Sequence, residues 1–157
     1  MITRYINDDI TKTSCQAIAH GVNCQGVMGS GVAKALYEAF PVVKEYYLKY
    51  YQVMKPKISR TSELLGYVDP VFINDRVIFN CFTQDKYGND STRYVDYPAV
   101  VDCFRELVDN YEQDIFDGPL AIPKIGCGLA GGNWEFMEQL INDVVGNKLE
   151  IWVYYKE

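Results

Sequence analysis

Short apolar segments alternate along the sequence with longer segments in which apolar residues recur every three or four positions. The short segments cover residues 2–6, 17–22, 64–68, 76–82, 120–125 and 149–155, and their length and composition predict strands. Residues 17–22 are almost continuously apolar, which is typical of a strand covered on both faces. Strands that alternate with helices predict an α/β sandwich, in which helices cover both faces of a central sheet.

Four amphipathic segments predict the helices. Ser30 is placed to cap a helix over residues 31–40, and Pro41 suits the first turn of the next helix. A third helix is predicted over about residues 98–113, where apolar side chains recur at the spacing of one helical face. Asn133 suits the N-cap of a fourth helix, which begins at Trp134.

Composition and charge narrow the class of protein. The 157 residues correspond to one domain, and 48% hydrophobic with 23% charged residues is typical of a soluble globular chain. The net charge of −6 argues against binding to nucleic acids or anionic membranes through bulk electrostatics. No apolar segment approaches the ~18 residues of a membrane-spanning helix, and the N-terminal residues do not resemble a signal peptide. We therefore expect a cytoplasmic protein whose partners include neither a membrane nor a nucleic acid.

The cysteines and the histidine bear on metal and redox chemistry. The five cysteines are widely spaced and form no C-x-x-C pair, and the chain has a single histidine, His20. This pattern indicates neither a disulfide framework nor a zinc site. We expect reduced, mostly buried thiols, no metal and no cofactor.

Two glycine-rich segments each follow a predicted strand and precede a predicted helix. They are residues 26–31 (GVMGSG) and residues 126–132 (GCGLAGG). Glycine lets backbone N–H groups approach an anion closely, and the helix N-terminus beyond adds a favourable dipole. Ligands collect at the carboxyl ends of strands in such sheets, so we expect a diphosphate between the two segments. The alternative is that both are ordinary tight turns.

Other glycine motifs do not fit. A full G-x-G-x-x-G is absent because position 34 is Lys, and the chain has neither a P-loop nor a G-x-S-x-G elbow. A dinucleotide dehydrogenase, a P-loop NTPase and an α/β-hydrolase are therefore not indicated.

Four segments in order carry a resemblance to a known family: residues 7–10 (NDDI), 19–33 (AHGVNCQGVMGSGVA), 79–84 (FNCFTQ) and 122–134 (IPKIGCGLAGGNW). Together they resemble the macro domain, the ADP-ribose-binding module, over essentially the whole chain. The last two segments are most similar to the branch of small ADP-ribose-1''-phosphate phosphatases and of hydrolases that remove ADP-ribose from glutamate or DNA. The resemblance implies one α/β/α domain with a mixed sheet and ADP-ribose or its 1''-phosphate as ligand.

The resemblance also implies positions for the ligand. Asp9 resembles the family aspartate that accepts from the adenine amino group, assisted by the backbone of Ile10, although Asp9 alternatively caps its loop. Asn23 falls where the family has an asparagine over the distal ribose. Tyr155 lies near the position of an aromatic that stacks on adenine, but its spacing also suits plain sheet packing. The phosphates and distal ribose would be held by Gly29, Ser30, Gly31 and Val32, and from the other side by Gly126, Gly128, Leu129, Ala130 and Gly131.

Three departures from the family pattern bear on the reaction. His20 stands where most macro domains have an asparagine, and Ala130 where many have an aromatic. Gln84 stands where the glutamate-directed and DNA-directed hydrolases have the lysine that forms a covalent adduct. The aspartate that the glutamate-directed enzymes use would align with Ala130. The lysine–aspartate chemistry therefore does not transfer, which favours the phosphatases.

The resemblance and these departures predict a metal-independent phosphatase whose catalytic residues are His20, Asn23 and Asp90. Backbone N–H groups would stabilise charge on the phosphoryl oxygens, while His20 positions water or protonates the leaving group near neutral pH. Asp90, in the polar loop after Gln84, is the second candidate. A packed core histidine and a turn-capping Asp90 are the structural alternatives. The alternative functions are a non-catalytic ADP-ribose or poly-ADP-ribose reader, and a de-ADP-ribosylating or O-acetyl-ADP-ribose hydrolase.

Overall fold

Six strands form one mixed sheet in the computed structural model, which describes residues 1–157. In spatial order they are β1 (Ile2–Asn7), β6 (Ile151–Tyr155), β5 (Leu120–Ile122), β2 (Ala17–Asn23), β4 (Arg76–Gln84) and β3 (Val68–Ile73). Neighbouring strands from β1 to β4 are parallel, and β3 runs antiparallel beside β4 at the edge of the sheet. The carboxyl ends of β6, β5, β2 and β4 therefore lie at one edge.

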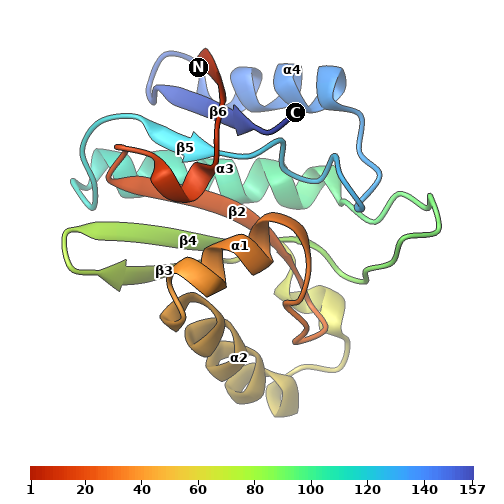
Figure 1. The fold of residues 1–157 in the computed structure, drawn as a ribbon. Coiled ribbons are helices and arrows are strands. Elements are labelled where there is room, and N and C mark those ends of the chain that lie inside the picture. Colours follow the sequence, from red (N-terminus) through yellow and green to blue (C-terminus); the bar gives the residue numbers. More distant parts are fainter.

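The helices cover both faces of this sheet, as Figure 1 shows. On one face lie α1 (Gly31–Ala39) and α2 (Val42–Met54), and on the other α3 (Tyr97–Glu112) and α4 (Trp134–Val145). Three short 3₁₀ helices complete the structure: η1 (Ile10–Lys12), η2 (Lys55–Lys57) and η3 (Thr61–Leu64). The predicted three-layer α/β/α sandwich is confirmed.

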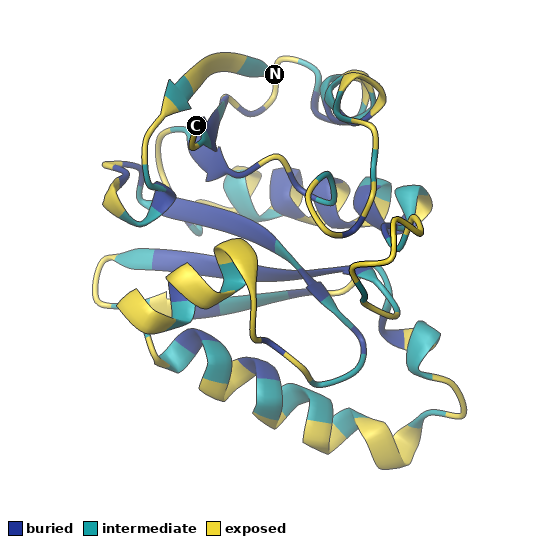
Figure 2. Ribbon diagram, turned by 45° about the vertical axis from the view of Figure 1, so that its right-hand side comes forward, coloured by how far each residue is buried: buried dark blue, intermediate teal, exposed yellow.

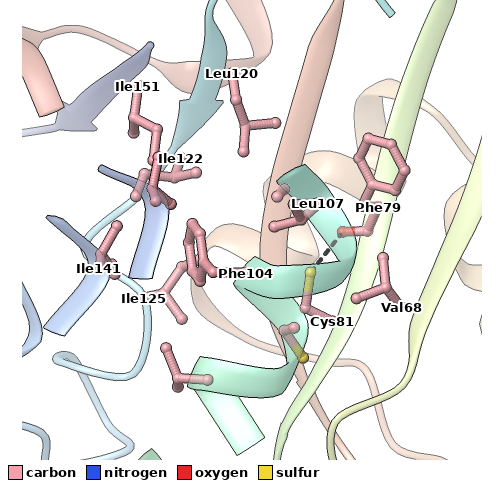
Figure 3. Packing of buried hydrophobic residues seen from close by; sticks show 14 of the residues in the cluster. Val68, Phe79, Cys81, Phe104, Leu107, Leu120, Ile122, Ile125, Ile141 and Ile151 are labelled. Atoms are coloured by element: carbon pink, nitrogen blue, oxygen red, sulfur yellow. Dashed lines mark hydrogen bonds between the residues drawn. The ribbon is translucent and has the colours of Figure 1, made fainter. Parts of the chain in front are cut away.

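Each face of the sheet has its own hydrophobic core, and β2 contributes to both. Ala17 and Ala19 join the cluster beneath α3 and α4, part of which Figure 3 shows, whereas Ile18 and Val22 join the cluster beneath α1 and α2. Figure 2 shows β2 and β4 buried along most of their length. The almost continuous apolar pattern of residues 17–22 thus has the predicted cause, which is burial on both faces.

The strand predicted at residues 64–68 is wrong. Leu64 ends η3, and the strand begins instead at Val68. It forms a hairpin with β4 through a tight turn at Asn74, whose φ of 55° suits asparagine. Pro70 lies in the middle of this strand and has no N–H to donate, which an edge strand tolerates.

The strand predicted at residues 120–125 is shorter than expected, and its length shapes the molecule. It pairs with β2 only at Ala17↔Leu120 and Ile18↔Ala121 and ends at Ile122, before Pro123, which cannot donate to a ladder. On its other side β2 stays paired with β4 as far as Asn23. An opening therefore begins beyond Ile18, between β2 and the segment that follows β5.

The cysteines and the helix lengths complete the description. All five cysteines are free; four are buried and Cys127 is partly exposed, which confirms the expected reduced, mostly buried thiols. None of the helices combines the length and the apolarity required to cross a bilayer.

Two helix starts offer a matched test of capping. The Asn133 side chain accepts a hydrogen bond from the Phe136 N–H at 3.0 Å, whereas the Ser30 side chain makes no cap bond to α1. Asn133→Ala should therefore lower the free energy of unfolding by about 1 kcal/mol. Ser30→Ala, the control, should change it by less than about 0.5 kcal/mol. Urea denaturation measures both, and equal losses would contradict this account of the two helix starts.

Candidate functional site

A cavity of about 950 Å³ occupies the opening beside β2, at the carboxyl edge of the sheet. Its lining comes from four strand ends and the loops after them. We call residues 24–30 the first loop and residues 123–133 the second loop. The cavity is lined by the end of β2 (residues 20–23), most of both loops, the start of α1, residues 84 and 87–89, and Tyr154 and Tyr155. Concave sites with polar groups converging on them are the usual sites of small-molecule binding.

The first loop is held by a buried tyrosine. The Tyr47 hydroxyl, on α2, accepts a hydrogen bond from the Gly26 N–H at 3.1 Å and lies 2.8 Å from both the backbone and the side-chain oxygen of Asn23. The Asn23 side chain also accepts from the Gln25 N–H and donates to the Val27 carbonyl. Asn23 therefore lines the cavity as predicted, but its side chain first of all shapes the loop.

Both loops contain residues that line the cavity and whose backbone N–H groups have no hydrogen-bond partner in the protein. In the first loop and the start of α1 they belong to Gly29, Ser30, Gly31 and Val32, and in the second loop to Gly126, Gly128, Leu129 and Ala130. A Cβ atom built on Gly29, Gly31 or Gly128 would meet nothing within 4 Å, so the space beside this backbone is open. Two sets of free donors therefore converge on one cavity, an arrangement that suits an anion.

The charges around the cavity also favour an anion. Lys124 is the only charged side chain that lines it, and no aspartate or glutamate does, although the chain as a whole carries a charge of −6. The Lys124 ammonium lies 5.2 Å from the centre of the Tyr155 ring, at the β6 end. The side chains that line the cavity therefore carry a positive charge, although the chain as a whole is negative.

His20 is among the cavity-lining residues, but its side chain is buried. Its Nε2 lies 2.5 Å from the Asn80 side-chain oxygen, and its Nδ1 has no partner. Burial lowers the pKa of His20 to about 4, while the hydrogen bond with Asn80 raises it slightly. The expectation that His20 titrates near neutral pH is therefore wrong, because burial disfavours the charged form of the ring.

Two residues expected at the adenine lie outside the cavity lining. The Asp9 carboxylate caps η1, where Oδ1 accepts from both the N–H and the hydroxyl of Thr11. These two hydrogen bonds lower the pKa of Asp9. Ile10 is buried in the core beneath α1 and α2. Asp9 remains close to Tyr155 along the sheet edge, because the N–H of Asp8 donates to the Tyr155 carbonyl at 3.0 Å.

Asp90 and Gly131 also lie outside the cavity lining. The exposed Asp90 carboxylate accepts from the Thr92 N–H and the Tyr94 hydroxyl, at 3.2 and 2.8 Å, and so caps its own loop. A Cβ on Gly131 would lie 2.8 Å from the Thr92 carbonyl oxygen, so this glycine is required for packing of the two loops. The structure corrects both placements: neither residue reaches the cavity as it stands.

Sequence reasoning missed three residues of the site. Tyr47 follows the apolar helical pattern. The one signal in the sequence for its role in holding the first loop is that a buried tyrosine hydroxyl requires a hydrogen-bond partner. Asn80 stands in the apolar run IFNCF, where a buried amide requires specific partners. Lys124 shows no pattern of its own, because the fold alone brings it to the cavity.

No family model matches the chain, but individual relatives do. A 17.5 kDa protein from the tk-vs intergenic region of Enterobacteria phage T4 is 32% identical over 153 residues, covering 96% of this chain and 94% of its own length. The ADP-ribose 1''-phosphate phosphatase of Debaryomyces hansenii is 30% identical, covering 96% and 97%. The DNA ADP-ribosyl glycohydrolase of Thermus aquaticus is 28% identical, and the chain spans 40% of its length.

Solved structures agree with these relatives on the fold. A protein of unknown function from Bacteroides thetaiotaomicron has a TM-score of 0.81 and 29% identity, covering 98% of this chain and 97% of its own. The macrodomain of Thermus aquaticus DarG has a TM-score of 0.77 and 24% identity, covering 99% and 98%. The fold and the cavity define an α/β/α domain with a crevice between two glycine-rich loops. The chain belongs to the macro domain family.

The buried His20 should make the stability of the fold pH-dependent. Its folded pKa of about 4 lies below the ordinary 6.5, so the unfolded chain binds more protons between these values. The stabilisation is complete above pH 6.5 and is lost as the pH falls towards 4. Acidification from pH 7 to pH 4.5 should lower the free energy of unfolding less in His20→Gln than in the wild-type chain. The difference should be about 2 kcal/mol, as measured by urea denaturation at both pH values.

Asp69 provides the control for this measurement. Burial raises its pKa from 3.8 to about 6, so between these pH values Asp69 binds more protons in the folded than in the unfolded chain. Acidification therefore stabilises the fold through Asp69, whereas it destabilises the fold through His20. Asp69→Asn should therefore steepen the loss of stability on acidification, while His20→Gln flattens it. If the two variants have the same pH dependence as the wild-type chain, the buried environment assigned to His20 is wrong.

Proposed function

We propose that the chain binds ADP-ribose in the cavity and acts as a phosphatase on ADP-ribose-1''-phosphate. The observation that carries the proposal is the pair of loops whose free backbone N–H groups line a cavity without carboxylates. Such donors suit a diphosphate and, in a reaction, the charge that develops on phosphoryl oxygens. Near full-length similarity to a relative named ADP-ribose 1''-phosphate phosphatase supports the same substrate.

The cavity has a direction that suggests how the ligand lies. Tyr155 at the end of β6 and Gln84 at the end of β4 are separated by at least three strand spacings, about 14 Å, because β5 and β2 lie between them and are no longer paired at this edge. We assign adenine to the Tyr155 end, where Asp9 keeps Oδ2 free of protein partners, and the diphosphate to the space between the loops. The distal ribose then lies towards Asn23 and Gln84.

The proposed reaction is attack of water on phosphorus. A new bond forms between the water oxygen and phosphorus, the bond between phosphorus and the anomeric oxygen breaks, and that oxygen takes up the proton that the attacking water loses. The first and second loops stabilise the phosphoryl charge through their N–H groups, and the neutral His20 orients the water as an acceptor. Asp90 holds the loop that carries Tyr87 and Asn89 to the cavity. No step is assigned to a metal ion.

A covalent mechanism through lysine at the end of β4 is not proposed. Gln84 occupies that place and donates to the Lys86 carbonyl at 2.9 Å, so no amine stands there. The second candidate function is a non-catalytic ADP-ribose reader. It is favoured by the burial of His20, which is only 1% exposed, because binding through the two loops does not require this side chain.

Turnover distinguishes the two functions. Release of phosphate from ADP-ribose-1''-phosphate should proceed in the presence of EDTA and should fall by about 10²-fold in His20→Ala. Binding of ADP-ribose, measured by calorimetry, should change much less than turnover in this variant, because the two loops supply most of the proposed contacts to the ligand. A wild-type chain that binds ADP-ribose without releasing phosphate would instead be a reader, and loss of activity in EDTA would exclude the metal-independent route.

The two loops are tested by adding bulk and negative charge. Gly31→Glu should weaken ADP-ribose binding by at least about tenfold, because the side chain enters the space assigned to the diphosphate. Gly118→Glu is the matched control: both glycines have positive φ, 61° and 76°, and open space beside them, but Gly118 lies outside the cavity. Equal affinity of the two variants, each with native circular dichroism, would remove the diphosphate from this loop.

A further inference from the structure

A row of polar side chains crosses three neighbouring strands beneath α1 and α2. His20 on β2 is in register with Asn80 on β4, and Asn80 is in register with Asp69 on β3. His20 and Asn80 are completely or almost completely buried, in a sheet whose other buried positions are mainly apolar. Burying polar groups is costly unless each has a partner, so their arrangement requires an explanation.

The partners of Asn80 fix its orientation. Its Nδ2 lies 3.2 Å from the backbone carbonyl of Val43, at the start of α2. A carbonyl only accepts hydrogen bonds, so the amide nitrogen must face Val43 and the amide oxygen must face His20. That oxygen also only accepts, so the His20 Nε2, 2.5 Å away, must carry the proton. In the neutral ring, Nδ1 is then an acceptor.

This acceptor is left without a partner inside the protein. His20 Nδ1 is buried and makes no hydrogen bond, although His20 is among the cavity-lining residues. Its side chain lies between Ile18 and Val22 on the face covered by α1 and α2, the face from which Met28 and Ala33 also line the cavity. A buried polar atom left unsatisfied destabilises the free protein, and a donor from a ligand would remove that penalty.

We propose that Asn80 is a positioning residue that locks His20 in the Nε2–H tautomer, so that Nδ1 accepts a hydrogen bond from a hydroxyl or water in the occupied cavity. This inference rests on the proposed function only for the identity of the ligand in the cavity. It deepens that function because it limits His20 to accepting a hydrogen bond at Nδ1. In the resting protein the Nε2 proton is donated to Asn80, so it is not available to protonate the leaving group.

The surrounding ionisable groups leave this arrangement undisturbed at neutral pH. On the same face, burial raises the pKa of the Cys24 thiol to about 12 and that of Tyr47 further, so both are uncharged. Asp69, which faces Asn80 across the β3–β4 ladder, has a pKa raised to about 6 and one buried oxygen without a partner. It is therefore the one neighbour that changes charge in the range of the experiment.

The single histidine makes the tautomer directly measurable. In a ¹⁵N-labelled chain, the two ring nitrogens of His20 give the only imidazole signals, so long-range ¹H–¹⁵N spectra need no assignment. Between pH 5.5 and 8 the wild-type chain should show a protonated Nε2 and an unprotonated Nδ1. Addition of ADP-ribose should move the Nδ1 resonance in the direction of an accepted hydrogen bond. Asp69→Asn should leave the tautomer unchanged, which isolates Asn80 from the titration of its neighbour.

Two variants test Asn80 itself. Asn80→Leu removes the acceptor and should give a mixture of tautomers, with a lower kcat for phosphate release and little change in KM. Asn80→Asp keeps an acceptor beside Nε2, so it should retain the Nε2–H tautomer and raise the pKa of His20 towards neutrality. Combining it with Asp69→Asn removes the other nearby carboxylate, so the rise in the pKa of His20 then comes from the introduced carboxylate alone. A purely structural Asn80 would not move the tautomer in this pattern.

The outcomes separate this inference from the proposed function. A wild-type His20 protonated on Nδ1, or an unchanged tautomer in Asn80→Leu, would overturn the positioning role whatever the activity. A chain that binds ADP-ribose with no response at Nδ1 would overturn the acceptor role. Conversely, an Nδ1 response without phosphate release would support the inference in a protein whose phosphatase function had failed.

Discussion

The pairing between β2 and β5 lasts for only two residue pairs, and most of the site depends on that limit. Pro123 takes the chain out of the sheet, so the second half of β2 has β4 on one side and an opening on the other. Both glycine loops start beside this opening, and several of their backbone N–H groups have no hydrogen-bond partner in the protein. A longer β5 would close the crevice, because its backbone would form hydrogen bonds with the N–H and C=O groups along the open edge of β2.

The site is supported from beneath by a few buried polar contacts. Tyr47 ties α2 to the first loop, and Asn80 ties the same helix to His20 through the Val43 carbonyl. One helix thus positions both the backbone of the first loop and the imidazole ring of His20. Acidic side chains are absent from the cavity lining, so the negative net charge of the chain does not oppose an anionic ligand there.

The sequence predicts the layers and the loops better than it predicts which side chains reach the cavity. Burial on both faces makes β2 recognisable, and the N-cap at Asn133 is specified by its own residue. The apolar pattern misplaces the edge strand, because Pro70 interrupts that pattern and only an edge position tolerates a proline within a strand. Asp9 and Asp90 were assigned to the ligand, but each satisfies its own loop first, a competition between local and ligand hydrogen bonds that no pattern reveals. The pKa of His20 depends on burial, which spacing alone does not give.

Pro70 has a consequence for how this domain meets other copies of itself. Carbonyl groups alternate sides along a strand, and the Tyr67 carbonyl receives the Phe82 N–H of β4, so position 70 turns its nitrogen outward. A strand arriving at this edge would find no donor there and would meet the proline ring instead. Pairing with another strand is therefore disfavoured at the middle of β3, which opposes strand-by-strand aggregation of this protein at that edge in a crowded solution.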